Sequence, residues 1–358
     1  MRQKISALLV ALVLTISANA QQQVKSFDAF CYIFNNNYAF FDLHKVNWKA
    51  SYQKYRPLVS DDITNDSLFN IMSAMVKPLG DSHVNIIDAK RKKKFNAAGY
   101  SKFAAEFNTD SLKAAFWANN DRLLLANGFA PVKGYGSVFK GRHLFYYSRS
   151  ANYAYLRITR CFAKITDGEI DDKDFEMQVL DSLMAQSKGL RGIIIDVRAN
   201  IGGDDEFSYE VAGRFTVKPV TGHFKQERIA KTNKYSKLQK WIIQPRGSYA
   251  FTKPVMLLTN SKTVSAAEVL TLAMKQLPQV KTIGEPTEGN LSDMFSEDLP
   301  NGWSVTLSNQ KYYSPKMVCY EGVGVPVYVR VSNSLQELET GHDAVLSTAL
   351  NRMDAAAK

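Results

Sequence analysis

The 358-residue sequence predicts an α/β protein with a small helical part at its N-terminal end. From residue 24 to residue 76, apolar residues recur three and four positions apart, which is the spacing of amphipathic helices. After residue 150, short apolar runs alternate with amphipathic stretches, as in strands joined by helices. Such alternation is typical of a largely parallel sheet that is covered by helices.

The chain begins with the features of a signal peptide. Arg2 and Lys4 precede an apolar run that ends at the small residues Ala18 and Ala20. This run is shorter than the roughly 20 residues that a spanning helix needs. We therefore expect cleavage after residue 20, a periplasmic or secreted protein, and no stable membrane insertion. Cleavage would remove two positive charges and lower the net charge from +11 to +9.

Residues 21–92 are predicted to form an N-terminal helical bundle. The helical segments are residues 27–41, 48–59 and 67–79. Gly80 is placed to stop the last helix, and a polar turn then leads into an alternating strand at residues 84–88. Residues 93–150 form a connecting α/β segment to which the pattern assigns no fold, although residues 110–126 have helical spacing.

Residues 151–358 are predicted to form the main α/β domain. Its strands are residues 151–158, 191–198, 253–260 and 280–285, and its helices are residues 172–187, 204–215 and 265–277. In open sheets of this type the ligand crevice lies beyond the carboxyl ends of the strands. The turns in residues 196–205 and 259–268 both occupy that position.

Ser265, in the second of these turns, has two possible roles. Serine is a common N-cap, so the residue could simply start the helix. The same turn also places the Ala266 N–H in the first helical turn, where unpaired donors can stabilise an oxyanion. Ser265 is therefore also a candidate nucleophile. The absence of a GxSxG elbow argues against an ordinary α/β-hydrolase.

The first turn contains the glycine pair Gly202 and Gly203 after Asn200. Without side chains, this backbone could approach a substrate closely and supply a second N–H donor. The alternative is an ordinary tight turn before a helix. A phosphate loop is excluded because the GxxxxGK[ST] pattern is missing. We expect Asp196 and Arg198 to position this turn through an ion pair or hydrogen bonds.

A serine nucleophile needs a base, and the sequence contains His44, His83, His143, His223 and His342. Only His83 lies in a polar turn between a predicted helix and a predicted strand. This context favours His83 as a general base over a structural histidine.

The remaining charged and sulfur-containing residues indicate few partners. The basic run Lys90–Lys94 is expected to be a solvated loop, with capture of a peptide carboxylate as its other possible use, and no nucleic-acid partner is expected. Cys31, Cys161 and Cys319 permit at most one internal disulfide and lack metal-site spacing. No metal and no organic cofactor is expected.

Six segments in this order resemble the tail-specific, or C-terminal-processing, serine peptidases, particularly the tricorn-protease-like branch. They are LGDSHV, GIIIDVRANIGG, KPVMLLTNSKTVSAAEV, TIGEPTEGN, LPNGW and YEGVGVP. The resemblance implies a crotonase-like ββα-superhelix catalytic domain at residues 151–358, preceded by the helical bundle. Residues 93–150 lack the pattern of the PDZ domain that many relatives carry.

The resemblance also implies a set of catalytic residues. Ser265 matches the nucleophile, His83 the general base, Ser82 the serine beside that base, and Glu321 the acidic residue that completes the set. Asn290 stands where the Ser-Lys branch of the family has its lysine, which disfavours a lysine base.

The implied oxyanion hole consists of the N–H groups of Gly203 and Ala266, with Gly202 left open as the alternative glycine donor. The expected function is hydrolysis of peptides or unfolded proteins by an exported serine peptidase. The alternative is a noncatalytic module of the same fold that binds an apolar or peptide ligand. An acyl-CoA enzyme fits poorly with export away from the CoA pool.

Overall fold

The chain folds into two units, and each unit is built from three segments that are separate in the sequence. The computed structural model describes residues 22–166, 169–171 and 173–356. The first unit comprises Met1–Gly99, Gln226–Lys237 and Ser292–Lys311, and the second comprises Tyr100–Lys225, Leu238–Leu291 and Tyr312–Lys358. The predicted signal peptide lies outside the described residues.

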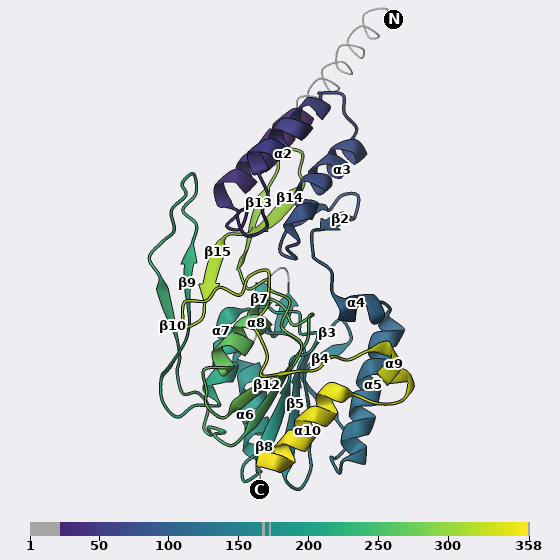
Figure 1. Ribbon diagram of the computed structural model, residues 1–358, viewed down its shortest axis with the longest axis vertical. Helices are drawn as coiled ribbons and strands as arrows, with labels where there is room; N and C mark the ends of the chain where they lie inside the picture. The colour runs from purple at the N-terminus through teal and green to yellow at the C-terminus, as the bar shows by residue number, and fades with distance from the viewer. Residues whose placement is uncertain (1–21, 167–168, 172, 357–358) are drawn as a thin grey trace, which may run out of the picture. The chain divides into compact units, whose positions relative to one another are not determined.

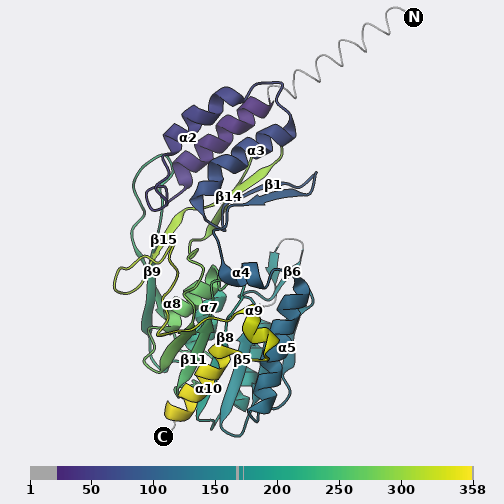
Figure 2. The same ribbon diagram turned by 45° about the vertical axis from the view of Figure 1, so that its right-hand side comes forward.

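The first unit contains the predicted helices. A helix spans residues 22–37, and it lies beside α2 (Trp48–Tyr55) and α3 (Asn65–Val76) (Figure 2). The side chains of Asn47 and Thr64 cap α2 and α3 by accepting backbone N–H groups of the first turns. Trp48 stacks on Phe34 with ring centroids 5.3 Å apart. Aromatic packing therefore holds the first two helices together.

A four-stranded antiparallel sheet completes the first unit, with strand order β13-β14-β1-β2. Its strands are β1 (Asn85–Asp88), β2 (Lys93–Asn96), β13 (Met294–Asp298) and β14 (Ser304–Ser308). Asn85 pairs with Thr306, which is 221 positions away in the sequence. The first unit therefore differs from the predicted bundle of residues 21–92, because local periodicity carries no signal for so distant a pairing.

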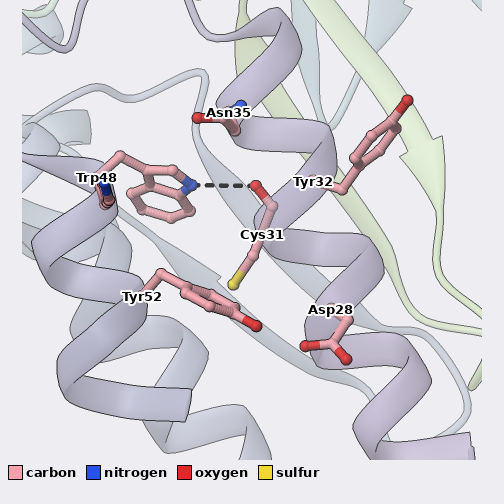
Figure 3. A pocket seen from close by; sticks show the side chains of 7 residues that line it. Asp28, Cys31, Tyr32, Asn35, Trp48 and Tyr52 are labelled. Atoms are coloured by element: carbon pink, nitrogen blue, oxygen red, sulfur yellow. Dashed lines mark hydrogen bonds between the residues drawn. The ribbon is translucent and has the colours of Figure 1, made fainter. Parts of the chain in front are cut away.

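A pocket of about 350 Å³ lies between the 22–37 helix and α2 (Figure 3). Trp48 donates its indole N–H to the carbonyl oxygen of Cys31 at 3.0 Å, across the two helices. Burial raises the pKa of the Cys31 thiol above its usual range. The thiol is therefore a packing group in this pocket and is not activated as a nucleophile.

The second unit is built on a seven-stranded sheet with strand order β16-β12-β11-β8-β5-β4-β3. Strands β5, β8, β11, β12 and β16 pair in parallel, whereas β3 and β4 form an antiparallel hairpin beside β5. The strands are β3 (Lys133–Phe139), β4 (Arg142–Arg149), β5 (Tyr153–Ile158), β8 (Gly192–Asp196), β11 (Val255–Thr259), β12 (Val280–Gly284) and β16 (Val329–Arg330). The predicted α/β class with a largely parallel sheet is confirmed.

Residues 93–150, to which the sequence assigned no fold, serve both units. They supply β2 to the first unit, and they supply α4 (Lys102–Glu106), α5 (Asp110–Ala126) and the β3–β4 hairpin to the second. The predicted helix at residues 110–126 is confirmed by α5. The hairpin extends the sheet because β4 pairs with β5 along most of its length.

Helices cover both faces of the large sheet (Figure 1). They are α6 (Lys173–Gln186), α7 (Asp205–Gly213) and α8 (Ala266–Met274) on one face, and α5 and α10 (Ala344–Ala356) on the other. Ile195 and Leu257 pack into the first core, whereas their neighbours Ile194 and Leu258 pack into the second. Successive side chains of a strand point to opposite faces, so coverage of both faces requires the continuous apolar runs of the sequence.

Smaller elements complete the second unit and its connections. They are β6 (Lys164–Thr166), β7 (Glu169–Asp171), β9 (Val220–Glu227), β10 (Gln239–Ile243), β15 (Gln310–Tyr313) and α9 (Leu335–Glu339). Strands β10, β9 and β15 form a three-stranded sheet in that order. Inside it, His223 is stacked between Trp241 and Tyr312, and its Nδ1 atom lies 2.6 Å from the Tyr209 hydroxyl.

His223 should make the stability of the second unit depend on pH. Burial, with a smaller effect of the Lys225 charge, lowers the pKa of His223 to about 3 from 6.5. Below pH 6.5 the unfolded chain binds a proton here and the folded chain does not, so stability is lost as the pH falls. Relative to His223→Gln, the wild type should lose about 1.4 kcal/mol per pH unit in that window. Urea unfolding between pH 6.5 and pH 4 measures this, and parallel pH profiles would contradict it.

Candidate active site

The turn after strand β11 leads directly to Ser265 at the start of α8. Asn260 donates its backbone N–H to Thr263 Oγ1 at 3.1 Å, and the Thr263 hydroxyl donates to the carbonyl oxygen of Val197 at 2.8 Å. Val197 follows the neighbouring parallel strand β8. Thr263 therefore ties the turn to the adjacent strand end, and both predicted turns lie at the carboxyl edge of the sheet.

Ser265 has a backbone conformation that is rare for a residue with a side chain. Its φ is 60° and its ψ is −130°, a combination that costs on the order of 1–3 kcal/mol outside glycine. The residue is half-buried. It occupies the N-cap position of α8, where Ser265 and Glu268 form a capping box, and the Glu268 N–H donates to the Ser265 carbonyl oxygen at 2.7 Å.

The glycine turn after β8 is held by Asn200. The Asn200 side chain donates to the carbonyl oxygen of Ile158 at 2.9 Å and accepts the Gly202 N–H at 2.9 Å. Its backbone carbonyl accepts the N–H of Val264 at 3.1 Å. One buried asparagine thereby fixes the glycine turn to β5 and to the residue before Ser265.

Two backbone N–H groups in this region are left for a ligand. Among the described residues, neither the Gly203 N–H nor the Ala266 N–H has a hydrogen-bond acceptor, whereas the Gly202 N–H is occupied by Asn200. Gly202 lies close to Ser265, since a Cβ built on it would be 2.6 Å from the Ser265 Cβ and 3.2 Å from the Ala266 nitrogen. Such a pair of donors beside a hydroxyl suits an oxyanion.

Glu321 is linked to this region through the loop that follows β12. The Glu321 side chain is buried, and its Oε2 atom accepts the Leu291 N–H at 2.9 Å. Gly322 donates its N–H to the carbonyl oxygen of Gly289 at 2.7 Å. The next residue of the loop, Asn290, accepts the Ser265 N–H on its carbonyl oxygen at 3.2 Å. The second unit thus connects Glu321 to Ser265 through residues 289–291.

Ser82 and His83 lie in the first unit, in the turn that leads from the helices into β1. Gly80 has φ +60° and ends the preceding 3₁₀ turn, η2 (Lys77–Leu79), as predicted. Asp81 accepts the His83 N–H at 2.8 Å, and the His83 carbonyl oxygen accepts the Thr306 hydroxyl at 2.6 Å. The backbone of His83 is therefore fixed. Its Nδ1 atom is buried and has no hydrogen-bond partner in the described part of the chain.

The candidate residues thus divide between the two units. Ser265, Ala266, Gly202, Gly203 and Glu321 belong to one hydrogen-bonded region of the second unit, and Ser82 and His83 belong to the first. The three cysteines form no disulfide among the described residues: Cys31 and Cys161 are buried and Cys319 is half-buried.

Cys161 borders the glycine turn but is not a competing nucleophile. Its N–H donates to the Gly202 carbonyl oxygen, and its own carbonyl oxygen accepts the Asp204 N–H, both at 2.8 Å. Burial raises the pKa of its thiol to about 12. Because the thiolate is the reactive form, this cysteine supports the turn without chemical activity.

Arg198 has the structural role that the sequence predicts. Its guanidinium is fully buried and contacts Asp196 at 2.7 Å and Asp343 at 2.9 Å. Its backbone N–H also donates to Asp196 at 3.0 Å. The pair positions the chain that enters the glycine turn.

Acidic side chains of the first unit partly neutralise the charge of the basic run Lys90–Lys94. Arg91 contacts Asp88 at 2.6 Å and Asp66 at 3.0 Å, and Lys93 contacts Asp66 at 2.8 Å. These pairs engage two of the five cationic side chains within the first unit.

The described residues lack two further kinds of feature. They contain no group of three or more His, Cys, Asp or Glu side chains arranged to hold a metal ion. They also contain no helix with the length and apolar character that crossing a membrane requires.

Glu268 is a residue of this region to which the sequence analysis assigned no role. Its side chain is buried, and it accepts the Ser265 N–H at 3.1 Å. A sequence signal was present, because a glutamate three residues after a serine N-cap is the capping-box pattern.

Comparison with known proteins identifies relatives of both units. The family model "Peptidase family S41" matches residues 152–331, half of the chain, and the model "Tricorn protease C1 domain" matches residues 21–77. The carboxy-terminal processing protease CtpA of Bacillus subtilis is 29% identical over 161 residues. A carboxy-terminal-processing protease of Bartonella bacilliformis is 24% identical over 200 residues.

The matched regions cover 45% and 56% of this chain, but only 31% and 43% of these two relatives. The match to a solved structure is more complete. The crystal structure of a candidate peptidase from Parabacteroides merdae is 25% identical, with a TM-score of 0.75, and the match covers 93% of this chain and 96% of that one.

Substitution of Gly202 should test how closely the two turns pack. In Gly202→Ala the new Cβ would lie 2.6 Å from the Ser265 Cβ and 2.7 Å from the Val264 carbonyl oxygen. Gly128→Ala is the matched control, because Gly128 has φ +78°, like the +77° of Gly202, and no atom within 4 Å of the added Cβ. Urea unfolding should show that Gly202→Ala costs roughly 2 kcal/mol more than Gly128→Ala. Equal losses would contradict the close contact.

Proposed function

This chain belongs to peptidase family S41, and we propose that it is an exported serine peptidase that hydrolyses peptide bonds in peptides or unfolded proteins. One observation carries the proposal. Ser265 lies in a strained turn after a parallel strand and packs closely against Gly202, and the N–H groups of Gly203 and Ala266 have no acceptor among the described residues. Strained residues of this kind cluster at functional sites, and an ordinary helix N-cap has an extended backbone instead.

In the proposed reaction, the Oγ atom of Ser265 attacks the carbonyl carbon of a peptide bond while His83 accepts the hydroxyl proton. When the tetrahedral intermediate collapses, the C–N bond breaks and His83 gives the proton to the leaving amine. Water then attacks the ester carbon while His83 accepts a proton from it. The bond between the acyl carbon and Ser265 Oγ breaks, His83 returns the proton to Oγ, and the acid product leaves and ionises in solvent. The role of His83 rests on the sequence resemblance.

The N–H groups of Gly203 and Ala266 are the proposed oxyanion donors. The Gly202 N–H donates to Asn200, which supports Gly203 as the glycine donor. Each such donor is worth on the order of 10²-fold to 10³-fold in rate. Glu321 would stabilise the imidazolium form of His83, with the Ser82 hydroxyl as an intermediate partner.

A serine-reactive peptide phosphonate tests the nucleophile and the base. Mass spectrometry should find the label on Ser265. The Ser265→Ala variant should carry no label, and its rate of peptide hydrolysis should fall by a factor on the order of 10⁴ or more. His83→Ala should slow labelling by at least roughly 10²-fold.

Two substitutions serve as controls for this experiment. Ser261→Ala changes a hydroxyl of the same turn that contacts Ser101 and Glu285, and His342→Ala removes an exposed imidazole. Both should label at the wild-type rate. Labelling that persists in Ser265→Ala, or no labelling of the wild type, would contradict the peptidase proposal, and the latter would favour the noncatalytic binding module.

Export is tested separately. The full chain, expressed in a bacterium, should be recovered outside the cytoplasm with Gln21 as its first residue, because the Ala18-Asn19-Ala20 site fits signal peptidase. Intact-mass measurement of the recovered protein gives its first residue. A protein that retains residues 1–20 in the cytoplasm would contradict this part of the proposal.

A further inference from the structure

We propose that Glu268 is a positioning residue whose carboxylate holds the Ser265 backbone in its strained conformation and fixes the loop Thr287–Asn290 beside it. The inference rests on the proposed function of Ser265 as nucleophile. Glu268 acts through Ser265 and needs no contact with a substrate.

The Glu268 carboxylate is buried and accepts four hydrogen bonds. Its Oε1 atom accepts the Thr287 hydroxyl at 2.6 Å and the Gly289 N–H at 2.7 Å. Its Oε2 atom accepts the Asn290 N–H at 2.8 Å and the Ser265 N–H at 3.1 Å. Two atoms of one side chain therefore connect the nucleophile candidate to three residues of a separate loop.

The same molecule contains an ordinary capping box for comparison. At the start of α9, Ser334 has an extended backbone with φ −136°, its hydroxyl accepts the Glu337 N–H, and Glu337 Oε2 accepts the Ser334 N–H at 3.1 Å. At the start of α8, Ser265 and Glu268 also form a capping box, but the serine has φ 60° and Glu268 accepts three further hydrogen bonds from Thr287, Gly289 and Asn290. The Glu268 contacts thus exceed what a helix start requires.

The strain of Ser265 explains why such a carboxylate is needed. A non-glycine residue persists in this conformation only where its surroundings over-determine it. The Ser265 N–H is directed between the Asn290 carbonyl oxygen at 3.2 Å and Glu268 Oε2 at 3.1 Å. Glu268 also accepts the Asn290 N–H, so it holds Asn290 in place. It therefore supplies one acceptor of the Ser265 N–H directly and positions the residue that supplies the other.

The loop carries this constraint onward to Glu321. Thr287 Oγ1 donates to Glu268 and accepts the Val325 N–H at 2.7 Å. The Gly289 carbonyl oxygen accepts the Gly322 N–H at 2.7 Å. The segment around Glu321 is therefore anchored on the same loop that Glu268 holds.

Stability alone does not explain a carboxylate at this position. Burial raises the pKa of Glu268 to about 7 despite the opposing hydrogen bonds of Thr287, Gly289 and Asn290. Among the described residues it forms no ion pair with a lysine or arginine. A buried charge without a cation is costly, and a well-packed apolar residue is often at least as stable. The carboxylate instead orients its four donors, because each of its two oxygen atoms accepts two hydrogen bonds.

The test measures inactivation of Ser265 by a peptide phosphonate, which separates binding (KI) from bond formation (kinact). Glu268→Gln keeps the shape but turns one end into an NH₂ group that faces N–H or O–H donors. We expect kinact to fall by about 10²-fold, as for a misplaced reacting group, with KI within about two-fold of wild type. A smaller folded fraction would not by itself lower kinact at constant KI, provided that the rates are measured well below the Tm of each variant.

Two further variants complete the test. Glu337→Gln makes the same change in the capping box of α9 and should leave kinact unchanged. Thr287→Val removes one donor to Glu268, together with the acceptor of the Val325 N–H, but keeps the Ser265 contact. We expect kinact to fall by about 10-fold, less than in Glu268→Gln, since the carboxylate remains.

The outcomes separate this inference from the proposed function. A wild-type protein that the phosphonate does not label overturns the role of Ser265 itself. A labelled wild type with an unchanged kinact in folded Glu268→Gln overturns only the role of Glu268. Should Glu268→Gln fail to fold, Thr287→Val decides, and an unchanged kinact in that folded variant overturns the inference.

Discussion

The parallel pairing of β8 with β11 is the constraint on which the candidate site in the second unit depends. Parallel strands end at the same edge of a sheet, so their following turns become neighbours although they are more than sixty residues apart in sequence. Val197 accepts the Thr263 hydroxyl, and Gly202 lies against Ser265 with no room for a Cβ. That adjacency brings the strained Ser265 against the glycine turn.

Buried polar side chains hold the irregular backbone around this edge. Asn200, Arg198 and Glu268 each bind several backbone or side-chain groups, and all three are almost completely buried. Loops at the edge of a sheet cannot satisfy their own backbone groups, so side chains must do so. These hydrogen bonds fix the directions of the hydroxyl and N–H groups that the proposed acyl transfer would use. They require the burial of polar groups, which costs free energy that a purely apolar core would not lose.

Membership in peptidase family S41 and the solved Parabacteroides merdae structure place this architecture among known ones. Within this chain, the proposed catalytic residues are distributed between the two units. The second unit contains the candidate nucleophile, the proposed donors Gly203 and Ala266, and Glu321. The first contains Ser82 and His83 in a turn fixed by Asp81 and Thr306. Each unit therefore prepares its part of the proposed catalytic set by local hydrogen bonding.

The sequence by itself determined the α/β class, the helical N-terminal segments and the position of the two turns at strand ends. These features are encoded by local periodicity, by apolar runs such as residues 255–258, and by Gly80 as a helix stop. It also supplied the set of candidate residues through motifs in a fixed order. Only the tertiary structure decided that β13 and β14 complete a sheet with β1 and that Glu268 is fully buried beside the Ser265 turn. It also decided that the Gly202 N–H donates to Asn200, whereas the Gly203 N–H has no acceptor among the described residues. These features depend on contacts between residues far apart in the chain, for which the spacing of side chains along one segment carries no information.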